Sequence, residues 1–264
     1  MIKEALRQII QDNKEKTRFL RYKNNLPNKP NNNDLYIVEF PKSGITWLST
    51  IIANTCFLEE GINKESTHYN IEQLIGDVHQ NKTISDINYH FPYHRIIKSH
   101  DNYNPYYRHV IYLVRNPFSV MISYYHFTLS NKYFDGTFHD FIRSEKFGVK
   151  SWVRHVESWL TPQKALKLHC LKYENLIDDP LETIKNLYIN LGWKIEENKI
   201  MQSIKLSSFD NMKLLNNHYK EFCPFRKYDF VRKGKKTTDM STEDKEYIYN
   251  CSVEILKDFY FDMV

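Results

Sequence analysis

The interpretation of this chain starts from residues 40–47, whose sequence is FPKSGITW. An apolar run at residues 35–40 leads into this stretch, and apolar residues recur at three- and four-residue steps from Trp47 to Thr55. These patterns predict a buried strand and a helix, joined by a tight turn. The first N–H groups of a helix lack internal partners and lie at the positive end of its dipole, so the turn is suited to bind an anion.

The side chains of the turn suit a phosphate group. Lys42 adds a mobile cation, Ser43 and Thr46 add hydroxyl groups, and Gly44 lets a ligand approach the backbone closely. The stretch is not a Walker loop, G-x-x-x-x-G-K-[ST], because its lysine precedes a single glycine. The sequence therefore predicts a phosphate-binding loop with a lysine at its entrance. A lysine in an ordinary strand–helix turn is the alternative interpretation.

Composition fits one large α/β domain with a substantial core. The chain has 264 residues, of which 41% are hydrophobic and 26% are charged. Its net charge of +5 suits an anionic ligand. The basic residues are spread along the chain without a long basic arm, which argues against nucleic acid as a partner.

Strand-like apolar runs alternate with helical patterns along the chain. The runs span residues 35–40, 95–98, 109–114 and 165–171, and the helical patterns span residues 118–130 and 148–160. A third helix is predicted to begin at Asp179 as N-cap, with Pro180 at its first position. The alternation predicts a single domain with a central parallel β-sheet flanked by helices. Ligands of such sheets bind at the carboxyl ends of the strands, where the loop lies.

Residues 1–33 are predicted to be an N-terminal helical extension and an Asn- and Pro-rich linker, ahead of a domain at residues 34–264. No apolar stretch approaches membrane-spanning length, and the N-terminus lacks the apolar segment of a signal peptide. The four cysteines lie far apart without a C-x-x-C pair, so they predict reduced thiols rather than disulfides or a zinc site: Cys56, Cys170, Cys223 and Cys251. We therefore expect a cytoplasmic protein without a membrane span.

Two further strand ends carry polar residues. The strand at residues 95–98 is followed by Ser99 and His100, and an imidazole titrates near neutral pH, which suits proton removal from an acceptor hydroxyl. The strand at residues 109–114 is followed by Arg115, whose guanidinium suits an anion, and by Ser123 about two helical turns later. A surface histidine and a helix-capping arginine are the plain alternatives.

Three later segments complete the set of motifs. Residues 171–176 are LKYENL, residues 207–209 are SSF, and residues 230–236 are FVRKGKK. Taken singly, a tyrosine or phenylalanine most often packs in the core, and a basic loop is most often solvated. These segments indicate a function only when they are considered together with the earlier motifs.

In this order, P-K-S-G-x-T-W, K-S-H, R-N-P-x-x-x-x-x-S, Y-E, S-S-F and R-K-G resemble the motifs of the sulfotransferases that use 3′-phosphoadenosine 5′-phosphosulfate (PAPS). The resemblance runs from about residue 34 to residue 236 and is nearest to the soluble, cytosolic type. It implies a P-loop-like, nucleoside-phosphate-binding α/β fold. It also implies transfer of a sulfuryl group from PAPS to a hydroxyl or amine, with 3′,5′-bisphosphoadenosine (PAP) as product.

The resemblance assigns a role to each motif. The 5′-side phosphate is expected on Lys42, Ser43, Gly44, Ile45, Thr46 and Ser207, the 3′-phosphate on Arg115, Ser123, Arg232, Lys233 and Gly234, and the adenine near Trp47, Tyr173 and Phe209. As catalytic residues we expect Lys42 to stabilise the leaving bisphosphate, Lys98 to support the leaving or transferred group, and His100 to act as general base. Nothing in the sequence calls for a metal.

The chain departs from the family pattern in four respects. Ile45 stands where the family usually has a second threonine, and Ser207 replaces another threonine. The tryptophan that commonly follows the R-K-G loop is missing, and so is the K-x-x-x-T-V-x-x-x-E dimer motif of many animal members. The oligomeric state is therefore left open.

The acceptor is the least defined part of the prediction. Segments 60–93 and 124–147 are expected to line its pocket with aromatic rings and one imidazole: Phe91, Tyr93, Tyr124, Tyr125, His126 and Phe127. Such a wall suits a phenol or another flat alcohol, but a glycan and plain core packing also fit it. A small molecule is favoured slightly.

Two other classes of function stay open as alternatives. A phosphoryl transferase would need a Walker lysine and usually a carboxylate for magnesium, and neither is evident. A non-catalytic nucleotide-binding protein would keep the loop without the chemistry, and the presence of both Lys42 and His100 argues against it.

Overall fold

The structure is a computed structural model that describes residues 26–27, 30–66, 70–71, 74–78, 94–161, 166–222 and 240–260, with backbone alone for residues 216–222. Several predicted features lie outside these residues: the helix at residues 1–20, part of the linker, Phe91, Tyr93, Cys223, and the R-K-G residues Arg232, Lys233 and Gly234. The division at residues 33 and 34 stays a prediction.

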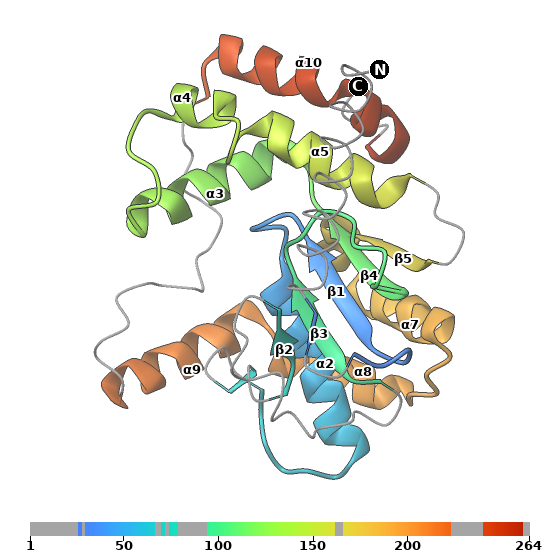
Figure 1. The fold of residues 1–264 in the computed structure, drawn as a ribbon. Helices are drawn as coiled ribbons and strands as arrows, with labels where there is room; N and C mark the ends of the chain where they lie inside the picture. The colour runs from blue at the N-terminus through green and yellow to red at the C-terminus, as the bar shows by residue number, and fades with distance from the viewer. Residues whose placement is uncertain are drawn as a thin grey trace, which may run out of the picture.

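Five parallel strands form the central sheet in the order β2-β3-β1-β4-β5 (Figure 1). The strands are β1 (Leu35–Glu39), β2 (Gly76–Asp77), β3 (Ile96–Ser99), β4 (His109–Val114) and β5 (Lys167–Lys172). The predicted parallel sheet is confirmed, and four of its strands lie where apolar runs predicted them. β2 was not predicted, because two residues carry no readable period.

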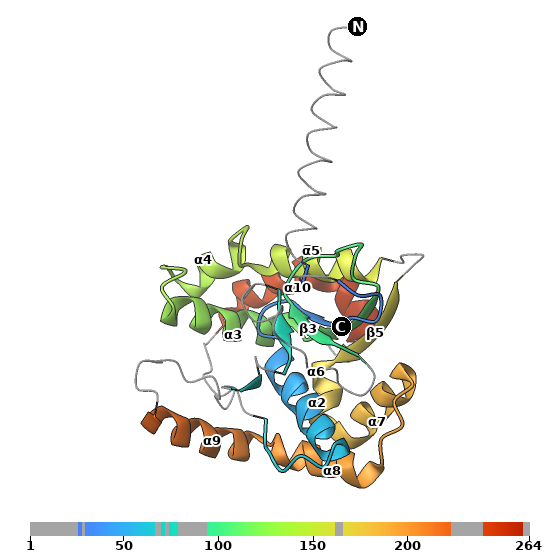
Figure 2. The ribbon, with the colours of Figure 1, turned by 60° about the horizontal axis from the view of Figure 1, so that its bottom comes forward.

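Helices cover both faces of the sheet (Figures 1 and 2). One face packs against α2 (Ile45–Glu59), α6 (Tyr173–Asp178), α7 (Pro180–Leu191) and α8 (Glu197–Leu206), from which α9 (Phe209–Phe222) continues. The other face packs against α3 (Pro117–Ser130), α4 (Phe138–Arg143), α5 (Val149–Leu160) and α10 (Thr242–Phe259). Of these helices, α2, α3, α5 and the start of α7 were predicted from the sequence, and the others were not.

β1 shows why its sequence is apolar throughout. Leu35 and Ile37 enter the core on the α2 side, whereas Tyr36 and Val38 enter the core on the α3 side. A strand buried on both faces has no solvent side on which polar residues can alternate. The strand ends with Glu39, which is only 2% exposed, so a carboxyl group lies in the interior directly before the loop.

Side chains cap the starts of α3 and α7, but not the start of α2. Asn116 caps α3 by accepting from the Ser119 N–H at 2.9 Å, and Asp179 caps α7 by accepting from the Glu182 N–H at 3.1 Å, as predicted for Asp179. α2 begins after Gly44 without a capping bond from the Gly44 position. The acceptor for its first N–H group comes instead from Glu39.

The core on the α3 side contains a buried histidine. His155 Nδ1 lies 2.9 Å from the Tyr112 hydroxyl, and the imidazole packs edge-on against Phe40 at 5.6 Å. Burial lowers the pKa of His155 to about 3, with a further contribution from nearby His100. The ring is therefore neutral in the folded protein at every pH at which the chain is expected to work.

We predict that His155 makes the fold sensitive to acid. Between pH 6.5 and pH 3 an unfolded histidine binds a proton that buried His155 does not, so stability falls as the pH falls through this range. At pH 5 the loss due to His155 is about 2 kcal/mol. Urea unfolding at pH 7 and pH 5 measures it, with His155→Asn as the comparison. An equal pH dependence in both proteins would contradict the prediction, since the other histidines are common to the two.

Candidate donor and catalytic site

The loop between β1 and α2 closes on itself through short bonds. The Ser43 N–H and the Ser43 hydroxyl both donate to the Phe40 carbonyl oxygen, at 3.2 and 2.9 Å. Gly44 has φ 117°, and Lys42 has φ 78°, which is an uncommon conformation for a residue with a side chain. A strained backbone held by its surroundings is typical of ligand-binding loops. The bonds of Ser43 turn its hydroxyl inward, and its predicted phosphate contact stays a prediction.

Glu39 holds the two ends of this loop. One carboxylate oxygen accepts from the Lys42 N–H at 3.2 Å and the other from the Ile45 N–H at 2.6 Å. Burial raises the pKa of Glu39 to about 7, and the raise is limited by these two amide bonds and by the charges of Lys42 and Arg115. The loop is thus bonded to a carboxyl group that can change its charge near neutral pH.

Ile45 is a core residue. Its side chain is 5% exposed and packs in the cluster that contains Leu48 and Ile51. A hydroxyl in the same direction would face the core rather than a phosphate group. The departure of Ile45 from the family pattern therefore strengthens the core under α2.

His100 lies beside the loop because β3 pairs with β1. The pairing of Val38 with Ser99 places His100 next to the end of β1, and His100 Nδ1 lies 3.3 Å from the Glu39 carbonyl oxygen. A carbonyl oxygen can only accept, so in the neutral ring Nδ1 carries the proton and Nε2 has the lone pair. The imidazole is 32% exposed and is oriented as a base requires. Lys98, also predicted as catalytic, is 9% exposed on β3.

Arg115 links β4 to the loop. Its guanidinium donates to the Lys42 carbonyl oxygen at 3.2 Å and stacks on the Tyr173 ring at 4.3 Å. Its Nε is buried and has no hydrogen-bond partner among the described residues. Tyr173 in turn contacts Trp47 edge-on at 5.9 Å. The structure thus brings together Lys42, Trp47, Arg115 and Tyr173, which the sequence analysis predicted for one nucleotide site.

A partly buried hydrogen-bond network fixes the segment that follows Arg115. The backbone N–H and the side-chain amide of Asn116 donate to one oxygen of Glu174, at 3.1 and 2.7 Å. The other oxygen accepts from the Tyr260 hydroxyl at 3.0 Å. Glu174 thereby ties the start of α3 to the end of α10. This role was not predicted, although Glu174 lies within the segment LKYENL.

Ser207 holds the indole of Trp47. The Trp47 indole N–H donates to the Ser207 carbonyl oxygen at 2.9 Å, and the fully buried Ser207 hydroxyl accepts from Asn54 at 2.9 Å. Phe209, two residues on, begins α9. The predicted contacts of Ser207 with a phosphate and of Phe209 with adenine stay predictions, whereas the bonds found here orient Trp47.

α3 borders the loop on the side where the acceptor was predicted. The ammonium of Lys42 lies 4.8 Å from the centre of the Phe127 ring, and half-buried Ser123 lies one turn before Phe127 on the same helix. Tyr124 stacks beside Phe127 and packs edge-on against Phe40, Phe141 and Phe147. Core packing thus accounts for Tyr124, while Phe127 is close to the predicted reaction centre.

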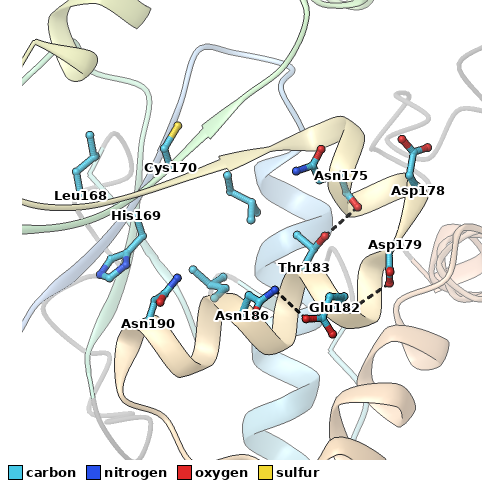
Figure 3. Close-up of a pocket in the computed structure, with 12 residues that line it drawn as sticks. Leu168, His169, Cys170, Asn175, Asp178, Asp179, Glu182, Thr183, Asn186 and Asn190 are labelled. Atoms are coloured by element: carbon cyan, nitrogen blue, oxygen red, sulfur yellow. Dashed lines mark hydrogen bonds between the residues drawn. The ribbon is translucent and has the colours of Figure 1, made fainter. Parts of the chain in front are cut away.

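A cavity of about 730 Å³ lies elsewhere, between β5 and α7 (Figure 3). Polar groups in its wall bond one another: the Thr183 hydroxyl donates to the backbone carbonyl oxygen of Asn175 at 2.9 Å, and the Asn186 amide donates to the Glu182 carboxylate at 3.0 Å. None of the predicted site residues lines it. It is therefore distinct from the site at the loop.

Comparison with known proteins agrees with this geometry. The family model described as Sulfotransferase domain matches residues 32–260. Sulfotransferase 1B1 of Mus musculus is 30% identical over 233 residues, which are 76% of this chain and 74% of that protein. Luciferin sulfotransferase of Photinus pyralis is 28% identical over 209 residues, 68% of this chain and 56% of that protein. The crystal structure of mouse sulfotransferase SULT7A1 complexed with PAP has a TM-score of 0.64 at 20% identity and covers 89% of this chain and 87% of that chain.

The chain belongs to the sulfotransferase family. The fold predicted from the sequence and the class of enzyme, a PAPS-dependent sulfotransferase, are confirmed. In the described part of the chain, no helix is both long and apolar enough to span a bilayer.

We predict that Gly44→Ala disrupts the nucleotide site. A methyl group there would overlap the Tyr173 ring, and the backbone conformation of Gly44 is unfavourable for alanine. Displacing Tyr173 moves the ring on which Arg115 stacks, so PAP affinity should fall by at least about tenfold, which corresponds to about 1.4 kcal/mol. Calorimetric titration with PAP measures the change.

Gly61→Ala is the matched control for backbone strain. Gly61 also has a positive φ, 67°, but nothing lies within 4 Å of a methyl group there. Both substitutions should lower the melting temperature of the protein, and only Gly44→Ala should lower its affinity for PAP. Equal PAP affinities in the two variants would show that the Tyr173 contact does not matter for the site.

Proposed function

We propose that this chain transfers the sulfuryl group of PAPS to a hydroxyl or amine of a small-molecule acceptor at the mouth of the β1–α2 loop. The observation that carries the proposal is the approach of His100 to this loop, with its Nδ1 3.3 Å from the Glu39 carbonyl oxygen. This short distance supports the proposal that the general base lies at the same edge of the sheet as the loop whose backbone binds phosphate. The choice of PAPS as donor is supported by the match to the sulfotransferase family and by the PAP bound in the structure of mouse SULT7A1.

In this proposal the loop binds the 5′-side phosphate. Within the described residues, no protein acceptor is found for the N–H groups of Gly44 and Thr46, so both are available to an anion. Lys42 and the Thr46 hydroxyl add to the same site. Arg115 and Ser123 bind the 3′-phosphate together with the predicted R-K-G residues, which lie outside the described residues.

The adenine is proposed to lie against aromatic rings. Trp47 and Tyr173 contact each other beside Arg115, and the Ser207 carbonyl oxygen fixes the Trp47 indole. Phe209 is proposed as a further stacking ring. An aromatic face binds a purine largely through stacking, so this part of the site needs few hydrogen bonds.

The chemical step needs one base and one cation. His100 Nε2 takes the proton of the acceptor hydroxyl while the acceptor oxygen attacks sulfur. The bond between sulfur and the bridging oxygen breaks, and PAP leaves with the electron pair. Lys42 stabilises the negative charge that develops on this oxygen, which favours the transition state over the ground state. Lys98 is proposed to support the leaving or transferred group.

His100→Ala should lower turnover sharply, by about 10²- to 10⁴-fold, because a general base contributes about that factor. PAP affinity should change little, since His100 contacts the acceptor side. Steady-state turnover with labelled PAPS and calorimetric PAP binding separate the two effects. His139→Ala is the control, because His139 is exposed on α4 and pairs with Asp244 away from the loop. Unchanged turnover in His100→Ala would remove His100 from the mechanism.

The acceptor is proposed to be a small molecule rather than a glycan. Phe127 faces Lys42 at the predicted reaction centre, and a curated relative is named for a small-molecule acceptor, luciferin. A labelled-PAPS assay over phenols, alkyl alcohols, amines and oligosaccharides tests the class. We expect transfer to phenols. Transfer to oligosaccharides alone would contradict the proposal.

A cytoplasmic location is also proposed. Three cysteines in the described residues, Cys56, Cys170 and Cys251, are free thiols, as is typical of a reducing compartment. The thiols support the proposal without identifying the compartment.

A further inference from the structure

Glu39 is the one acidic residue in the sequence of β1, and its position is unusual for a site that binds a polyanion. Its side chain is 3% exposed, and its carboxylate occupies two N–H groups of the loop, those of Lys42 and Ile45. A phosphate-binding loop normally keeps such N–H groups for its ligand. Here a protein carboxylate bonds to the loop and brings a negative charge next to the predicted 5′-side phosphate.

We propose that Glu39 is a proton-linked positioning residue of the donor site, which holds the empty loop as a carboxylate and takes up a proton when the anionic donor binds. This inference rests on the proposed function, because it takes PAPS or PAP as the anion at the loop. The proton comes from solvent and forms an O–H bond on a carboxyl oxygen of Glu39. No other bond changes.

The charges around Glu39 support the direction of this linkage. The positive groups are Lys42 from the loop and Arg115 from the end of β4, and His100 Nδ1 from the end of β3 lies 3.9 Å from a Glu39 oxygen. The phenols of Tyr112 and Tyr173 also face it, and their pKa values are raised, so both stay neutral. When Lys42 and Arg115 pair with the donor phosphates, they stabilise the negative charge of Glu39 less. The bound phosphates also bring a negative charge close to the Glu39 carboxylate.

The position of its pKa makes the effect measurable. In the empty site the pKa of Glu39 is about 7, because burial opposes its charge. A bound anion raises it further, so the complex holds a proton that the free protein has partly lost above pH 7. PAP affinity should therefore fall as the pH rises, by up to about 15-fold between pH 7 and pH 8.5.

The test is calorimetric titration of the full chain with PAP at pH 7.5 in buffers of different ionisation enthalpy, which counts protons taken up on binding. The wild type should take up as much as about 0.8 proton per PAP, and Glu39→Gln should take up close to none. PAP itself does not explain the uptake, because a phosphate with a second pKa of about 6 releases protons when it binds cations.

Two further variants separate Glu39 from its surroundings. His100→Ala should keep the uptake, which excludes the neighbouring imidazole as the group that takes the proton. Asp34→Asn is the matched control, because Asp34 is a buried carboxylate directly before β1 that pairs with Arg95 at the other end of the same strand. If Glu39→Gln does not fold, the test uses the other two variants. The inference is then supported if His100→Ala and Asp34→Asn both keep the proton uptake and if PAP affinity falls above pH 7.

The outcomes are distinguishable. Uptake that persists in Glu39→Gln, or that disappears in His100→Ala, overturns the role of Glu39 while PAP still binds. PAP binding without any uptake by the wild type overturns it as well. Failure of PAP to bind at any pH overturns the proposed donor, and this inference with it.

Discussion

The pairing of β1 between β3 and β4 is the constraint on which the site depends. Parallel strands in register end at one edge of the sheet, so the residues that follow them meet there. The loop follows β1, His100 follows β3, and Arg115 follows β4. A shift of register by one residue would exchange the two faces of β1 and separate these groups. The buried apolar side chains on both faces of β1 fix the register.

The electrostatics of the site follow from this meeting of strand ends. Lys42 and Arg115 bring positive charge to the first turn of α2, and the helix N-terminus adds to it. Glu39 is the buried acid that keeps the empty loop ordered, and its bonds to Lys42 and Ile45 substitute for a capping side chain at Gly44. A loop made only of cations and unbonded N–H groups would be less stable without its ligand. Order in the empty state and affinity for an anion are therefore coupled through one carboxyl group.

Local patterns predicted most of the fold. β1, β3 and β4 were found because strands buried on both faces are continuous apolar runs. β5, a partly exposed edge strand, was found from its apolar residues, and α7 was found through Asp179 and Pro180. β2 was missed because it has two residues, and α8, α9 and α10 were not predicted. The site residues Lys42, His100, Arg115 and Tyr173 were predicted as one set, and the structure places them around one loop.

The sequence by itself determined the class of protein, since the order of its motifs and its alternating apolar runs are local properties that need no coordinates. Only the tertiary structure decided what Glu39, Ile45, Glu174 and Ser207 do. Glu39 was not distinguished within the apolar run at residues 35–40, and Ile45 looked like a lost hydroxyl. Their roles depend on burial and on partners such as His100, Asn116 and Asn54. Burial and long-range hydrogen bonds arise when distant segments pack, so the local sequence carries no direct sign of them.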